Sequence, residues 1–192
     1  MAGLVKRIGP INFQPRRLPP FQSITHAIIH QQLSGKAARK IFERFTALFG
    51  DHDFPTPAQV KNVDVDDMRR AGLSRSKSMY IKGLAEMAMI GKVPSLEECD
   101  ELSDEEIKDQ LTKIKGIGLW TVEMLLIFNF GRPDILPIHD LGVRKGFQIA
   151  YKKRKLPTPE QLKRSGTKWM PYRTLATLYL WRAVDFVNLD EW

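Results

Sequence analysis

The residues with the clearest chemical meaning lie between Leu111 and Thr121, which read LTKIKGIGLWT. The spacing of Gly116 and Gly118 predicts that one helix ends, the chain turns sharply and a second helix begins. Both glycines permit a positive φ and the close approach of another backbone. The N–H groups at the start of the second helix then point outward at one place and can bind a phosphate oxygen. Glycines between helices are also typical of ordinary turns, so phosphate binding needs further support.

Other reactive side chains are few. Cys99 is the only cysteine, which excludes an internal disulfide and a four-cysteine zinc or iron–sulfur site made by this chain alone. Cys99 lies among acidic residues, with no basic neighbour that would favour the thiolate, so we expect no thiol chemistry. His26, His30 and His52 are too scattered in the sequence to predict a metal site.

The charge favours a polyanionic partner. The 192 residues carry 30 Lys and Arg against 22 Asp and Glu, a net charge of +8, and the isoelectric point is about 9.6. Such an excess governs association and not fold. Residues 144–168 hold nine basic side chains and one acid, Glu160; a solvated face and a phosphate-binding face both stay open for this stretch. Residues 97–109 hold eight acids, which we interpret as a solvated face.

The sequence does not predict a membrane protein. No apolar run reaches the roughly 18 residues that cross a bilayer. Residues 1–17 are polar and interrupted by proline, unlike a secretion signal. We therefore expect an intracellular protein, in the cytoplasm or nucleoid of a prokaryote or in the nucleus of a eukaryote.

The elements that must position these groups are helices. Apolar residues recur at spacings of three and four, and no alternating strand pattern is longer than four residues. Helices are expected over 21–49 with a break at Ser34-Gly35, where Ser34 could cap the second half, and over 57–70, 74–90, 103–114, 118–130, 140–151, from 159, and from 170 to the C-terminus. The caps are Thr56, Ser103 with Glu106, Asp140 and Thr158. The prediction is an all-α protein of about eight or nine short helices.

Four segments together resemble the helix-hairpin-helix, Gly/Pro-Asp superfamily of DNA base-excision glycosylases. They are the hairpin LTKIKGIGLWT, the loop ILPIHDLGVRKGF (135–147), AIIHQQLSGKAA (27–38) with the following GLSRSKSMYIKGLA (72–85), and WMPYRTLATLYLW (169–181). The resemblance spans residues 20–186. It implies a two-lobed helical bundle with the lesion pocket between the lobes, and one glycosylase domain over residues 1–192 with an N-terminal tail of about residues 1–19.

The branch of the superfamily follows from the chemistry of one position. Members that also cleave the DNA strand carry a Schiff-base Lys two residues after the second hairpin glycine, and Trp120 stands there in this chain. A tryptophan cannot form an imine, and the lone Cys99 cannot form the four-cysteine cluster usual in endonuclease III relatives. The chain thus resembles the monofunctional alkylpurine branch, typified by 3-methyladenine DNA glycosylases, without their N-terminal β-rich domain.

The resemblance implies a hydrolysis assisted by one carboxylate. Alkylation at a purine ring nitrogen makes the base cationic, so the base leaves without obligatory acid catalysis. A carboxylate stabilises the oxocarbenium-like transition state or orients the attacking water. Asp140 matches that carboxylate; its position is also that of an ordinary helix N-cap, and both roles are compatible. His139 precedes it and is left outside the catalytic set.

The resemblance also assigns residues to the damaged base. Trp120 and Trp181 match the pocket tryptophans, which favour a cationic purine by stacking and cation–π attraction. Met124 lies where the branch's type enzyme has a tyrosine, and this departure affects base preference. Gln32 matches the side chain that wedges into the gap left by the flipped nucleotide, and Gln31 and Ser34 brace the same loop.

Phosphate contacts are expected from the hairpin N–H groups around Gly116 and Gly118 and from basic side chains. These side chains are Lys36, Arg39, Arg144 and Lys145, and binding should weaken with salt. Family hairpins bind a monovalent cation, Na⁺ or K⁺, through backbone carbonyls, here those of Thr112, Ile114 and Ile117. No other cofactor is expected. The partner is double-stranded DNA containing damaged bases, not a membrane, and the protein is expected to be a monomer.

Two other functions stay open. A glycosylase for neutral lesions such as hypoxanthine, ethenoadenine or uracil would need a proton donor, which the sequence does not identify. A noncatalytic helix-hairpin-helix DNA-binding module would need no carboxylate at the reacting sugar, so Asp140 and the two tryptophans speak against it.

Overall fold

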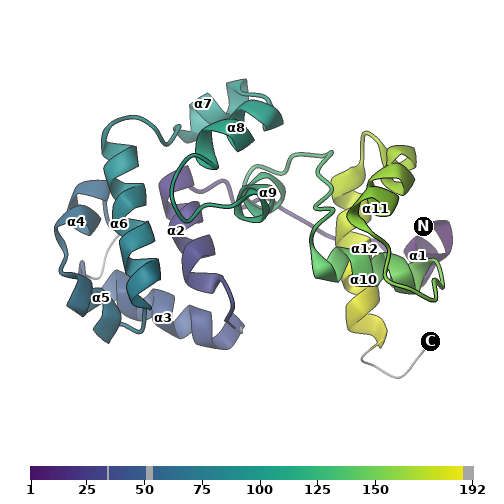
Figure 1. Cartoon of the computed structure of the whole chain (residues 1–192), viewed down its shortest axis with the longest axis horizontal. Coiled ribbons are helices and arrows are strands. Elements are labelled where there is room, and N and C mark those ends of the chain that lie inside the picture. The colour runs from purple at the N-terminus through teal and green to yellow at the C-terminus, as the bar shows by residue number, and fades with distance from the viewer. Residues whose placement is uncertain (34, 51–53, 188–192) are drawn as a thin grey trace. The chain divides into compact units, whose positions relative to one another are not determined.

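The computed structural model describes residues 1–33, 35–50 and 54–187, and every regular element in these ranges is a helix (Figure 1). The all-α prediction is confirmed. The elements are α1 (Ala2–Ile8), α2 (Pro20–His30), α3 (Gly35–Ala47), α4 (Pro57–Asn62), α5 (Val65–Arg70), α6 (Arg75–Met89), α7 (Leu96–Glu101), α8 (Asp104–Leu111), α9 (Leu119–Phe128), α10 (Leu141–Ala150), α11 (Pro159–Gly166), the 3₁₀ helix η1 (Thr167–Trp169) and α12 (Arg173–Val187). None of the helices in the described ranges is long and apolar enough to cross a membrane.

The chain packs into two compact units. The central unit is Arg16–Leu125, and the terminal unit combines Met1–Pro15 with Leu126–Trp192. Helix α6 is the centre of the central unit, because α2, α4 and α5 all pack against it (Figure 1). Fully buried apolar side chains such as Ile28, Phe45 and Leu84 form its core.

The terminal unit is built around the contact between α10 and α12. A Cβ atom on Gly146 of α10 would overlap the carbonyl oxygen of Leu180 in α12, so only glycine permits the two helices to approach this closely. Leu4 of α1 joins the same core as Leu180 and Phe147. The N-terminal tail expected for about residues 1–19 therefore contains a packed helix at residues 2–8.

Most helix ends lie where local side-chain hydrogen bonds predict them. Thr56, Ser103 and Thr158 each form a capping box with the residue three positions later, and Ser74 caps α6. Ser34, which we expected to cap a helix, lies outside the described residues. His52 lies outside them as well.

The helices differ from the prediction at several places. Residues 57–70 form two helices, because Asp64 adopts an extended conformation and caps α5 through the backbone N–H of Asp66. Helix α7, with its own capping box from Ser95 and Glu98, was not predicted within the acidic stretch. Helix α8 ends at Leu111 instead of residue 114, and α12 begins at Arg173 instead of residue 170.

Candidate functional site

The carboxylate of Asp140 is fixed by two N–H donors. Asp140 is the N-cap of α10, and its Oδ1 accepts hydrogen bonds from the backbone N–H of Val143 at 2.8 Å and from Nε1 of Trp181 at 2.9 Å. The side chain is half-buried. A carboxylate held in this way points in one direction and lies at the N-terminal end of α10.

Trp181 is oriented by its surroundings in the terminal unit. Its ring stacks on Phe128 with centroids 5.5 Å apart and an interplanar angle of 18°, while its N–H is directed to Asp140. Gly142 leaves the space for this contact, because a Cβ atom there would lie 2.9 Å from Cδ1 of Trp181 and 3.0 Å from Oδ1 of Asp140. Sequence reasoning did not identify Gly142 or Phe128, although Gly142 lies within the quoted loop motif.

The loop that leads to Asp140 is tied to the start of α12. Arg173 forms a two-pronged ion pair with Asp134, with Nε–Oδ1 at 2.7 Å and Nη2–Oδ2 at 2.8 Å. These hydrogen bonds hold the pKa of Asp134 below its ordinary value. The Thr174 hydroxyl donates to the carbonyl of Arg132 at 2.6 Å and accepts from the N–H of Ile135 at 3.0 Å. Sequence reasoning did not identify Asp134, although its partner Arg173 lies in the segment WMPYRTLATLYLW that resembles the superfamily.

The basic residues after Asp140 differ in their roles. Arg144 is half-buried and its Nε donates to the carbonyl of Pro157 at 2.8 Å, so it braces the loop that follows α10. Lys145 is exposed, as a phosphate-binding side chain would be, and His139 is exposed as well. We expected Arg144 to bind a DNA phosphate, and the structure shows that it also makes a hydrogen bond within the protein.

The hairpin between α8 and α9 depends on one glycine. Gly116 has φ of +90°, and a Cβ atom there would overlap the ring of Tyr80 in α6. Gly118 has no positive φ, and a Cβ atom there would meet no atom within 4 Å, so it uses neither the positive φ nor the close approach that glycine permits. Tyr80 therefore sets the position of the turn, and open space at Gly118 leaves the start of α9 accessible to a ligand.

Trp120 and Met124 lie one turn apart on α9. Trp120 is 43% exposed, which is high for a tryptophan and excludes an ordinary core role. Met124 is half-buried. An exposed indole next to the hairpin can stack on a base.

The loop after α2, which holds the expected wedge residues, is fixed by Lys77 of α6. Nζ of Lys77 donates to the carbonyls of Ile29 at 2.8 Å and Gln31 at 2.7 Å, and burial lowers the pKa of this amine. The Gln31 side chain donates to the Thr121 hydroxyl at 3.1 Å, which joins the loop to α9. Lys77 was not identified from the sequence, since a lysine in a helix is usually solvated.

Gln32 itself is exposed and has φ of +58°. Residues other than glycine rarely adopt this conformation. The residues that do adopt it are often found at functional sites. The structure presents the side chain to solvent, as a wedge requires. Lys36 and Arg39 are exposed on the first turns of α3, and Ser34 lies outside the described residues.

The comparisons with known proteins agree on one family. Residues 25–172 match the HhH-GPD superfamily of base excision DNA repair proteins. The chain is 40% identical to DNA-3-methyladenine glycosylase 1 of Schizosaccharomyces pombe over 98% of this chain and 83% of that protein.

Solved structures are similar over nearly the whole length. The S. pombe 3-methyladenine DNA glycosylase Mag1, in complex with abasic DNA, has a TM-score of 0.85 at 39% identity, covering 94% of this chain and 89% of that one. A DNA-3-methyladenine glycosidase from Bacillus halodurans has a TM-score of 0.86 at 34% identity, covering 97% and 85%.

Proposed function

The chain belongs to the HhH-GPD superfamily of base excision DNA repair proteins, and we propose that it removes alkylated purines from double-stranded DNA with Asp140 as its catalytic carboxylate. The products are the released base and an abasic site. The oriented carboxylate of Asp140, whose Oδ1 accepts from the Val143 N–H and from Nε1 of Trp181, is the observation that carries the proposal.

The geometry suits a reaction in which positive charge develops on the sugar. A 3- or 7-alkylated purine is cationic and leaves with the bonding electrons of the N-glycosidic bond, so the sugar becomes oxocarbenium-like. A carboxylate that is already oriented stabilises that charge without reorganising in the transition state. Water then adds to the sugar carbon and loses its proton, for which Asp140 is the proposed acceptor.

The enzyme is a hydrolase without lyase activity. A lyase step would need an amine nucleophile beside the hairpin, and Trp120 occupies that position. Trp120, Met124 and Trp181 are proposed to contact the damaged base. Because the N–H of Trp181 is bonded to Asp140, this tryptophan would link base recognition to the orientation of the carboxylate.

The remaining site residues are proposed to bind the DNA itself. Gln32 would fill the gap in the stack, with Gln31 and Ser34 bracing its loop. Gly116 and Gly118 with the N–H groups of α9 would bind one phosphate, and the exposed Lys36, Arg39 and Lys145 would bind others. Arg144 would act indirectly through the loop that it braces. We propose that the protein acts as a monomer in the compartment that holds the cell's DNA.

A monovalent cation fits the hairpin chemically. Hard cations take oxygen ligands, and the carbonyls of Thr112, Ile114 and Ile117 lie within one short turn. The Ile114 carbonyl accepts the N–H of Ile117 at 3.1 Å and has a second lone pair. A bound Na⁺ or K⁺ would add positive charge next to a phosphate.

The test is release of free base from methylated duplex DNA by the wild type and by Asp140→Asn. Asparagine is an equally good N-cap and keeps an oxygen for both donors, so the variant should fold normally. Loss of the charge should slow release of 3-methyladenine and 7-methylguanine about 100-fold or more. Asp185→Asn, which changes an exposed acid of α12, is the control and should keep the wild-type rate.

The outcomes separate the alternatives. Unchanged release of base by Asp140→Asn would refute the mechanism assigned to Asp140 but would still support alkylated purines as the substrate. Wild-type release of hypoxanthine, ethenoadenine or uracil, with none from methylated DNA, would favour the neutral-lesion enzyme. DNA binding without release of any base would favour the noncatalytic module.

A further inference from the structure

A second concave surface lies in the terminal unit at the C-terminal end of α10. Asp140 caps the N-terminal end of the same ten-residue helix, so the two sites are separated by about 15 Å of helix. The cavity has a volume of about 560 Å³, within the range of roughly 300–1,000 Å³ that is usual for ligand sites. None of the residues proposed above to contact the DNA or the damaged base lines it, although Pro157, whose carbonyl Arg144 binds, does.

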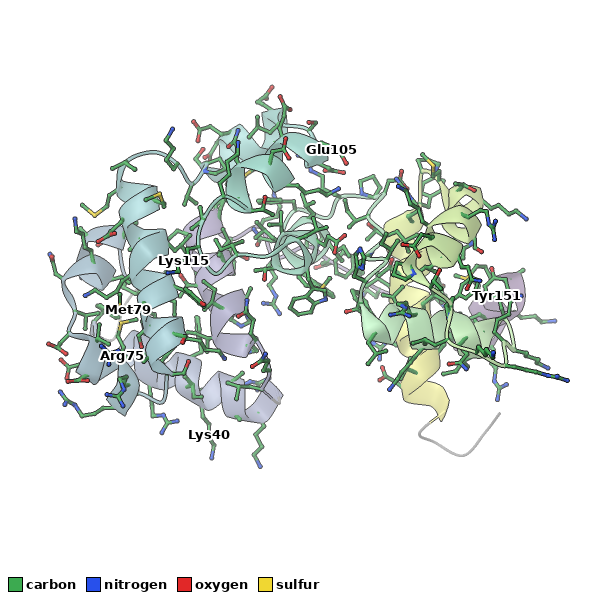
Figure 2. The ribbon with its side chains drawn as sticks, in the orientation of Figure 1. Lys40, Arg75, Met79, Glu105, Lys115 and Tyr151 are labelled. Atoms are coloured by element: carbon green, nitrogen blue, oxygen red, sulfur yellow. The ribbon has the colours of Figure 1, made fainter. Side chains whose placement is uncertain are left out.

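One wall of this cavity, which we call the basic pocket, is aromatic. Tyr151 stacks on Phe147 with centroids 4.5 Å apart at 25°, and Trp169 lies 6.0 Å from Phe147 and 6.4 Å from Tyr151. Phe147 is buried and anchors the cluster in the core, whereas Tyr151, marked in Figure 2, is 37% exposed. The wall therefore presents flat rings to a ligand on a rigid support.

The rest of the rim is positively charged. Five cationic side chains line the pocket: Lys153, Arg154, Lys155, Arg164 and Lys168. All five residues are exposed, and none forms an ion pair with another described residue. The only acid between residues 141 and 184 is Glu160, which does not line the pocket. This concentration of charge is suited to several phosphates and exceeds what one small anion requires.

The loop that carries three of these cations is held in place from α10. The Lys153 N–H donates to the carbonyl of Gln148 at 2.8 Å, and the Gln148 side chain donates to the carbonyl of Arg154 at 3.4 Å. Arg144 holds the far end of the loop at Pro157. The pocket is thus formed before any ligand arrives, which lowers the entropy that binding costs.

We propose that the basic pocket binds a short segment of single-stranded nucleic acid. Exposed rings that stack on bases, set among cations that follow the phosphates, are the features by which proteins bind single strands without sequence preference. A duplex would offer phosphates but keep its base faces inside the stack. An acidic peptide would satisfy the cations but make no use of the aromatic wall.

This site is additional to the one that acts on the damaged base, and it does not depend on the proposed excision. It gives the chain a second nucleic-acid contact, so duplex DNA and a single strand should be able to bind at the same time.

The test measures binding of 5′-fluorescein-labelled hexathymidylate by fluorescence anisotropy at low salt. Tyr151→Ala should weaken binding about tenfold, the effect of losing one base–aromatic stack, and Tyr151→Phe should restore it. The double variant Lys155→Gln with Lys168→Gln should weaken binding as much or more.

The matched control is the double variant Lys6→Gln with Lys163→Gln, two exposed residues of the terminal unit outside the pocket. It removes the same net charge and should change the Kd by less than a factor of two. Equal losses in the two double variants would overturn the proposal, because general charge would then explain binding. Thermal unfolding of each variant shows whether the aromatic cluster stays packed.

Photo-crosslinking locates the oligonucleotide directly. A hexamer carrying 5-iodouracil should crosslink to Tyr151 or Trp169, and a saturating duplex with an abasic-site analogue should not suppress the crosslink. Crosslinking to Trp120 alone would place the strand on the glycosylase site and refute the inference. Equally strong competition by a hexaglutamate peptide would show that the pocket recognises charge alone, which also contradicts it.

Discussion

At the scale of single residues, the candidate active site depends on one carboxylate and on what holds it. Asp140 is directed by the backbone of α10 and by the indole N–H of Trp181, and Gly142 leaves room for the two to meet. A residue without a side chain thus controls the geometry of the proposed catalytic carboxylate.

Gly142→Ala should lower the rate of base release about tenfold or more, because the added methyl group would displace Trp181 or Asp140. Stability should change little, since alanine suits a helix better than glycine does. Single-turnover excision together with urea unfolding checks both parts. Gly83→Ala in α6 is the control: no atom lies within 4 Å of its added Cβ, so it should stabilise the protein by up to about 1 kcal/mol and leave excision unchanged.

His26 is the residue whose titration should affect stability. Burial, the neighbouring His30 ring stacked at 3.8 Å and the Arg16 guanidinium lower the pKa of His26 to about 4. The two histidines, which the sequence suggested were scattered, are adjacent on α2. No group of three or more metal-ligating side chains occurs in the ranges that the structure describes.

Because the folded-state pKa of His26 is depressed, its neutral ring contributes stability that is fully present above pH 6.5 and is lost as the pH falls toward 4. Water screens part of this effect at a partly exposed ring, so the loss between pH 7 and pH 5 should be about 1 kcal/mol. Urea unfolding at both pH values measures it. His26→Asn should remove this part of the pH dependence, and the exposed His139→Asn should not. An identical slope in both variants would contradict the assignment.

At the scale of elements, the proposed site residues lie at helix ends. Helix α9 begins at the hairpin, α10 begins at Asp140, and the loop after α2 presents Gln31 and Gln32. Lysines of α6 support two of the neighbouring helix ends: Lys77 donates to the carbonyls at the end of α2, and Lys82 donates to the Val63 carbonyl at the end of α4.

These two lysines form a matched pair for a test. Lys77→Met and Lys82→Met each keep the aliphatic stem and remove the cation that donates to part-buried carbonyls, so each should destabilise the protein by about 1–3 kcal/mol. Only Lys77→Met should also slow excision, because Lys77, unlike Lys82, holds the loop after α2 that carries the proposed wedge residue Gln32. Single-turnover rates at saturating DNA report base flipping and excision, whereas rates at subsaturating DNA also report binding. Comparing the two shows which step has changed. Equal excision rates in the two variants would contradict the positioning role that we assign to Lys77.

At the scale of the whole molecule, the net charge of +8 should make DNA binding strongly dependent on salt. Neutralising about six phosphates would lower the association constant roughly 1,000-fold between 50 and 200 mM salt. Anisotropy titrations with a duplex that contains an abasic-site analogue measure the slope. Lys36→Gln with Arg39→Gln should reduce the slope by up to about two units, whereas Lys61→Gln with Lys92→Gln, exposed residues elsewhere on the central unit, should leave it unchanged.

The sequence by itself determined the helical class, most helix ends and the family. Caps such as Thr56, Ser103 and Asp140 are read correctly because each acts on backbone groups only two or three residues away. The hairpin and the Asp140 loop are likewise continuous stretches, so their resemblance to the superfamily is visible without coordinates.

Only the tertiary structure decided which distant groups meet. The Trp181–Asp140 bond spans 41 residues, the Lys77–Gln31 bond spans 46, and the Arg173–Asp134 pair spans 39. The same holds for α1, whose Leu4 enters the core of a unit made largely of residues after 125. Helical spacing shows which residues share a face of their own helix, but the partner of that face follows from how all the helices pack together. That partner also decides whether a lysine is solvated or holds a loop, and whether a glycine forms a turn or leaves room for two other side chains to meet.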